Sequence, residues 1–171
     1  MHLLIKQFFA ICLFRSGPQD LPTSKFLLLL SLLAYTLVGL LLALNKATLP
    51  ESLAMVSVDL ALLTGLSWLL LWIRVLGHRY TQTLTALAGC GAILALCAWP
   101  LLLWQQASGN DSVIMLAALL MWLWFFWQIM VFSHIISQAL SVPLFIGTFL
   151  ALVYMFISYS IAQTLFPQGT L

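Results

Sequence analysis

Charged residues are scarce in this sequence. The chain of 171 residues contains six Lys or Arg and four Asp or Glu, which together make up 6% of its length, whereas a soluble domain carries about 25% charged residues. A soluble protein of this size exposes a large surface that polar groups must cover. The composition therefore excludes a soluble globular enzyme, and the formal net charge of +2 is too small to indicate a nucleic-acid partner.

Cysteine and the usual chemical motifs are also in short supply. Cys90 and Cys97 lie seven positions apart on a predicted helix, about 10 Å along its axis, which is too far for a disulfide. The apolar stretch from Phe8 to Phe14 lacks the cleavage signature of a signal peptide, so we expect it to be retained. The sequence has no HExxH motif, glycine-rich phosphate loop or pair of intramembrane acids, and we predict no enzymatic activity, cofactor or metal.

Long apolar runs account for most of the chain, because 64% of its residues are hydrophobic. A membrane-spanning helix needs about 20 mostly apolar residues, and five segments meet this length. They cover residues 26–44, 52–73, 83–104, 113–135 and 142–166. The loops between them are short, so consecutive helices are predicted to be antiparallel neighbours. The expected fold class is an all-α integral membrane protein, with residues 1–171 forming a single five-transmembrane-helix bundle.

Two further elements precede the first span. Residues 1–14 are apolar on most sides but too few to cross a bilayer, which favours an N-terminal interfacial helix. Residues 15–25 contain Gly17, Pro18 and Pro22 and form a Pro-rich lead-in with an ordered turn or extended backbone.

The basic residues predict the orientation of the bundle. Five of them fall on one side of the predicted spans and Lys46 falls on the other. The five are Lys6, Arg15, Lys25, Arg74 and Arg79. Because cytoplasmic loops are enriched in Lys and Arg, we expect a bacterial inner (plasma) membrane protein with a cytoplasmic N-terminus and a periplasmic C-terminus.

Asp59 is the leading candidate functional residue, since it lies inside the second span. A carboxylate at such a depth costs about 2.5–3.5 kcal/mol on insertion scales and normally faces the interior of the bundle. Counting inward along each helix gives its predicted neighbours, which are Thr36, Cys97, Ser158 and Tyr159. Two interpretations remain open: a structural, hydrogen-bonded acid, or an ion or proton site.

Small residues indicate where helices pack closely. Ser57, Ala61 and Gly65 follow one another at four-residue spacing on the second span, and Gly91 and Ala95 do so on the third. Such stripes let a second helix approach. Because Asp59 and Ala61 point in different directions, the second span is predicted to be central.

Aromatic residues crowd the middle of the fourth span, where interfacial belts do not occur. They are Trp122, Trp124, Phe125, Phe126 and Trp127. Such a cluster is typical of bulky side chains that pack within the bundle or form a face for a partner's helix. It is also typical of a pocket for a lipid, quinone or other flat apolar ligand. We expect packing, because the cluster covers more than one helical turn.

Two histidines, His78 and His134, are predicted near the inner surface. Histidines on facing helices are able to ligate haem or a metal. We expect ordinary interfacial histidines instead, because His78 lies in a loop and no carboxylate is predicted near either ring.

The topology, together with the lead-in Gly17-Pro18-Gln19-Asp20-Leu21-Pro22, resembles the small bacterial members of the Yip1-type family of multi-pass membrane proteins. Eukaryotic members act in membrane trafficking and Rab GTPase binding and carry a cytoplasmic Asp-Leu-Tyr-Gly-Pro motif. Here Asp20-Leu21 matches only its first two residues, and no functional residue carries over.

These patterns lead to two main functional hypotheses. The first is a non-enzymatic scaffold or assembly partner of other membrane proteins, embedded in the lipid bilayer and associated with a membrane-protein partner or with itself. The alternative is a small transporter or channel that uses Asp59.

The charge distribution makes a first prediction about topology. A reporter fused after Leu171 is expected to be active as a periplasmic reporter and silent as a cytoplasmic one, because the five-to-one Lys and Arg bias retains the N-terminus inside. A cytoplasmic signal at that position would mean that the predicted loop between the fourth and fifth spans is wrong, or that residues 142–166 do not span.

Overall fold

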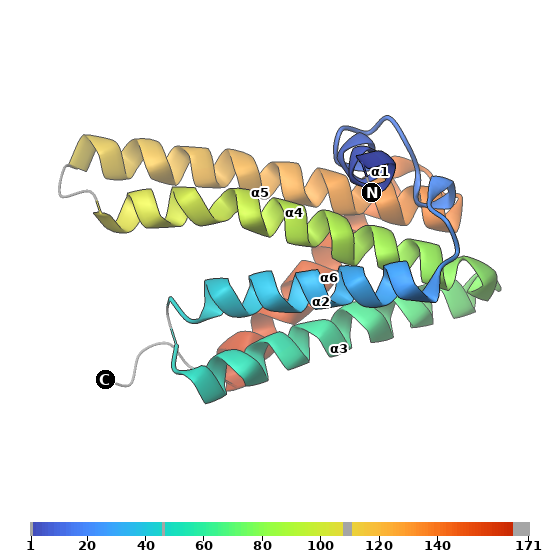
Figure 1. Ribbon diagram of the computed structural model, residues 1–171, viewed down its shortest axis with the longest axis horizontal. Coiled ribbons are helices and arrows are strands. Elements are labelled where there is room, and N and C mark those ends of the chain that lie inside the picture. The colour runs from blue at the N-terminus through green and yellow to red at the C-terminus, as the bar shows by residue number, and fades with distance from the viewer. Residues whose placement is uncertain (1, 46, 108–110, 166–171) are drawn as a thin grey trace.

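The computed structural model describes residues 2–45, 47–107 and 111–165, and it is helical throughout these ranges apart from turns (Figure 1). The helices are α1 (His2–Cys12), α2 (Lys25–Ala43), α3 (Leu49–Ile73), α4 (Tyr80–Ala107), α5 (Asp111–Leu140) and α6 (Leu144–Leu165), with short 3-10 helices η1 (Pro18–Asp20) and η2 (Gly77–Arg79). Five helices, α2 to α6, are long and apolar enough to cross a membrane. The predicted all-α five-span fold class is therefore confirmed.

The helix ends differ most from prediction between the last two spans. The predicted break after residue 135 is shorter, because α5 continues as far as Leu140. Only Ser141, Val142 and Pro143 separate α5 from α6, and Ser141 turns the chain with a φ of 53°. Pro143 ends the turn, since proline fits just before or at the first position of a helix but not inside one. Phe166, the predicted end of the span, lies outside the described residues.

The spans alternate in direction and α4 lies at their centre (Figure 1). It packs against α1, α2, α3 and α5. Half of its most apolar stretch (50%) is buried within the bundle, compared with 17% for α3. The structure thus corrects the prediction that α3 is central. Residues 83–92 of α4 are all buried, which gives this helix protein neighbours on every side.

The N-terminal helix is attached to the bundle by one face. Phe8 and Ile11 are buried against α4 and α5, whereas Phe9 is 49% exposed. A side chain at Gly89 would collide with the Phe8 ring, so the absence of a Cβ there allows α1 to lie directly on α4. The Cys90 thiol also donates a hydrogen bond to the Phe8 carbonyl, 3.7 Å away. The location of α1 at a membrane surface stays a prediction.

The lead-in closes one end of the bundle. Leu21 is only 1% exposed, and the Gln82 amide on α4 donates to its carbonyl oxygen at 2.7 Å. A ring nitrogen of His134 on α5 lies 3.1 Å from the Ser16 carbonyl oxygen. The lead-in is therefore hydrogen-bonded to both α4 and α5.

Two arginines join the turns at this same end. Arg74 donates to the Leu140 carbonyl at 3.3 Å, and Arg79 donates to the Ala139 carbonyl at 3.4 Å and the Ser141 hydroxyl at 3.1 Å. These carbonyls close α5, and a cation is favourable at a helix C-terminus. The α5–α6 turn contains no charged residue, but the Arg74 and Arg79 side chains place two positive charges beside it.

The remaining described basic residues belong to elements at that end as well, namely α1, the lead-in and the start of α2 (Figure 1). Lys46 lies outside the described residues. The arrangement is compatible with the predicted orientation, which itself stays a prediction.

Close contact between α5 and α6 makes a second prediction. A Cβ on Gly147 would stand 2.5 Å from the Ser133 backbone oxygen, whereas one on Gly65 would meet nothing within 4 Å. Gly147→Ala is expected to lower the free energy of unfolding by about 1–3 kcal/mol through overpacking. The matched control, Gly65→Ala, is expected to leave stability unchanged or to raise it by up to about 1 kcal/mol. Thermal unfolding in detergent tests the pair, and equal stability of the two variants would contradict the packing.

Candidate functional site

Asp59 is held by three hydroxyl groups from two other helices. Its Oδ2 accepts a hydrogen bond from the Tyr35 hydroxyl of α2 at 2.5 Å. Its Oδ1 accepts from Tyr154 at 3.1 Å and from Ser158 at 2.9 Å, both on α6. Asp59 lies ten positions into α3, about 15 Å along the helix. One acid thus connects α2, α3 and α6 inside the span.

Local sequence explains why these groups meet. Tyr154 and Ser158 are four residues apart and so occupy the same face of α6. The Tyr154 ring is fixed by an edge-on contact with Phe132, with ring centroids 6.0 Å apart. A Cβ on Gly91 would lie 2.7 Å from the Tyr35 ring, so glycine at this position of α4 gives that ring room to reach Asp59.

The sequence placed the neighbours of Asp59 at the correct depth but only partly on the correct face. Ser158 is a neighbour as predicted. Thr36 instead donates to the Leu32 carbonyl of its own helix at 2.8 Å. Cys97 is exposed, and Tyr159 is 64% exposed with its hydroxyl accepting from Gln163.

Two tyrosines take the places of these three residues. Tyr35 precedes Thr36, and Tyr154 lies one turn before Ser158. Each helical position is rotated by about 100° from the next, so a count of depth alone does not identify the inward face. The four-residue spacing of Tyr154 and Ser158 was the available signal.

A partly open cavity of about 320 Å³ lies beside Asp59, and all five spanning helices contribute to its wall. The lining residues are Tyr35, Gly39, Leu42, Ala43, Met55, Val56, Val58, Asp59, Gly91, Ala95, Trp124, Gln128 and Ser158. Asp59 is the one charged residue among them. Gln128 is half-buried, and its amide makes no hydrogen bond within the described part of the chain. The cavity therefore holds one acid and one unpaired amide in a mostly apolar wall.

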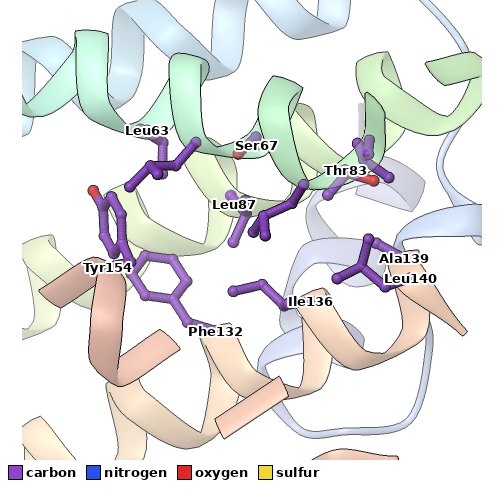
Figure 2. A pocket seen from close by; sticks show the side chains of 12 residues that line it. Leu63, Ser67, Thr83, Leu87, Phe132, Ile136, Ala139, Leu140 and Tyr154 are labelled. Atoms are coloured by element: carbon purple, nitrogen blue, oxygen red, sulfur yellow. The ribbon is translucent and has the colours of Figure 1, made fainter. Parts of the chain in front are cut away.

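An apolar layer lies on the other side of Tyr154 (Figure 2). A separate cavity of only about 30 Å³ is present there, lined chiefly by aliphatic side chains such as Leu63, Leu87 and Ile136. Figure 2 shows these side chains, from three helices, converging between Tyr154 and the end of α5 at Leu140. The wall of this cavity is mostly apolar. The layer thus separates Asp59 from the end of the bundle that carries the arginines.

The predicted packing residues fall into two groups. Gly91 and Ala95 face the cavity beside Asp59. Ser57, Ala61 and Gly65 are all exposed, and a Cβ added at Gly65 would meet nothing within 4 Å in the described part of the chain. The small stripe of α3 points outward because α3 lies at the edge of the bundle.

The aromatic cluster of α5 is divided in the same way. Trp124 lines the cavity and donates to the Leu94 carbonyl at 3.1 Å. Trp122 and Phe126 are 63% and 58% exposed, and their rings contact each other at a centroid distance of 6.2 Å. The cluster therefore does not form a single pocket.

The two histidines have different surroundings. His78 is exposed in η2, whereas His134 contacts the lead-in and the Phe14 ring. In the described ranges no group of three His, Cys, Asp or Glu side chains is placed to hold a metal.

No protein-family model, curated protein or solved structure matches this chain.

The hydroxyl contacts of Asp59 make a third prediction. Tyr154→Phe removes one hydrogen bond to the carboxylate and is expected to lower stability by about 0.6 kcal/mol, the average for hydrogen bonds between membrane helices. Tyr159→Phe is the matched control on the same helix, and its stability is expected to be almost unchanged, because the ring is exposed and its hydroxyl accepts a hydrogen bond from an equally exposed Gln163. Unfolding midpoints in one detergent would measure both. A larger loss in Tyr159→Phe than in Tyr154→Phe would contradict the assigned contacts.

Proposed function

We propose that this protein is a non-enzymatic membrane protein that binds a small solute in the cavity beside Asp59, in the manner of a small transporter. The carrying observation is the carboxylate itself, which lies in the wall of a cavity that all five spanning helices line. An ionisable residue inside a span is costly and is by default a functional candidate. The cavity provides space for a solute next to the carboxylate.

The surroundings of the cavity support a transport role over a purely structural one. A structural acid needs only its hydrogen-bond donors, and Asp59 has these in Tyr35, Tyr154 and Ser158. The half-buried carboxylate nevertheless also faces about 320 Å³ of open space. The apolar layer beyond Tyr154 closes the other side (Figure 2), as expected of a site that is reached from one side at a time.

A second candidate is the scaffold or assembly role, and the outward stripe of α3 favours it. Ser57, Ala61 and Gly65 are exposed and share a face with Trp68 and Trp72, whose rings stack at a centroid distance of 6.0 Å. Small residues at four-residue spacing suit a second helix, from another copy or from another membrane protein. Membership of the Yip1-type group stays a prediction, and neither candidate rests on it.

The fourth prediction tests the cavity with four small solutes and with the same substitution, Ala to Leu, at one position inside the cavity and one outside it. Choline, glycine, lactate and glycerol represent cationic, zwitterionic, anionic and neutral solutes. At least one is expected to raise the unfolding temperature of the wild type saturably, because a ligand at 100 times its Kd stabilises by about 2.7 kcal/mol. Ala95→Leu fills part of the cavity and is expected to abolish this shift.

Ala61→Leu is the matched control, since it adds the same side chain to an exposed position outside the cavity. It is expected to retain the solute response and, if α3 mediates association, to reduce the oligomer seen by light scattering. The proposal of a solute site fails if no solute shifts the wild type, or if both variants respond like the wild type.

A further inference from the structure

We infer that the cavity beside Asp59 binds an organic cation with a single positive charge, such as a protonated amine or a quaternary ammonium compound. This inference rests on the proposed function and adds the chemical class of the solute. Three features of the wall support it: the net charge, the mixture of polar and apolar groups, and the absence of a metal-binding set in the described residues.

The described part of the wall contains one acidic side chain and no basic one. Among the described residues that line the cavity, Asp59 is the only charged one. Its contacts from Tyr35, Tyr154 and Ser158 are all made by neutral hydroxyl donors, and these suit an ionised carboxylate because it only accepts hydrogen bonds. Charges in a low-dielectric site must be paired. One carboxylate therefore matches one monovalent cation, whereas an anion would be repelled.

The wall suits an organic cation better than an inorganic one. Ions such as Mg²⁺ and Ca²⁺ require about six or more oxygen ligands from protein or water. Most of the lining here is aliphatic or aromatic, including Leu42, Val56 and Val58, and such groups cannot replace a hydration shell. They do favour the alkyl groups of an organic cation. A cavity of about 320 Å³ also falls in the range of small-molecule sites.

Two side chains of α5 complete the site. Trp124 contributes an indole to the wall, and its ring is fixed by the hydrogen bond to the Leu94 carbonyl. Indole is the best of the aromatic partners for an organic cation. The Gln128 amide has no hydrogen-bond partner among the described residues, so it is free to bind a hydroxyl or ammonium group of the ligand. The acid and the two α5 groups thus surround one space.

The fifth prediction compares choline with 3,3-dimethyl-1-butanol, an uncharged analogue in which carbon replaces the nitrogen. The full chain is purified in a neutral detergent, and unfolding is followed by tryptophan fluorescence at constant ionic strength. Choline and tetraethylammonium are expected to stabilise the wild type saturably. The neutral analogue, NaCl and MgCl₂ are expected to have no saturable effect.

Two variants and a control assign the effect to this site. Asp59→Asn keeps the shape and a polar acceptor and is expected to weaken choline binding by about 30-fold or more, as for loss of a buried charge partner. Gln128→Leu leaves the hydroxyl contacts of Asp59 intact and is expected to weaken binding several-fold. Glu51→Gln removes one negative charge from exposed helix surface outside the cavity, and its choline affinity is expected to equal that of the wild type.

The possible results separate the two proposals. Equal binding of the neutral analogue, saturable binding of Na⁺ or Mg²⁺, or unchanged choline affinity in Asp59→Asn would overturn the cation class. If choline and tetraethylammonium fail but glycine, lactate or glycerol binds in an Ala95-dependent manner, only this inference fails. If no solute binds, the proposed function fails with it.

Discussion

The need to satisfy one carboxylate inside the membrane organises this bundle. Asp59 would be costly alone in hydrocarbon, and hydroxyls from α2 and α6 satisfy it. α2 and α6 are far apart in sequence, so the acid links the first and last spans through α3. The position of the cavity follows in part from the same contacts, because Tyr35 and Ser158, two of the three residues that hold Asp59, also line its wall.

The second constraint is the small size of the side chains on α4 where other helices approach it. Gly89 accommodates Phe8 of α1, and Gly91 accommodates Tyr35 of α2. Without these close approaches α1 would not lie on the bundle and the Tyr35 hydroxyl would not reach Asp59. The packing of α4 and the geometry of the polar site therefore depend on the same residue, because a side chain at Gly91 would displace the Tyr35 ring that bonds Asp59.

Much of the fold could be predicted from the sequence because hydrocarbon thickness and apolar run length determine spans directly. The span boundaries also gave the depth of Asp59, and counting inward from them identified Ser158 as a neighbour of that acid. The rotation of each helix could not be obtained, since small residues on α3 and α4 look alike in sequence. Only the structure shows that Gly91 faces Tyr35 and that Gly65 faces outward. The cavity was beyond sequence reasoning, because it is a space between five helices rather than a property of any one.

Direct contact between the Asp59 carboxylate and a bound cation is measurable by infrared difference spectroscopy. Choline is perfused over the reconstituted protein labelled with ¹³C at the aspartate side-chain carboxyls, and the carboxylate bands with and without choline are compared. If the carboxylate contacts choline, one ¹³C-shifted carboxylate band is expected to change saturably, and this change is expected to be absent from Asp59→Asn. A wild-type spectrum with no change in that band, or the same change in Asp59→Asn, would contradict this direct contact.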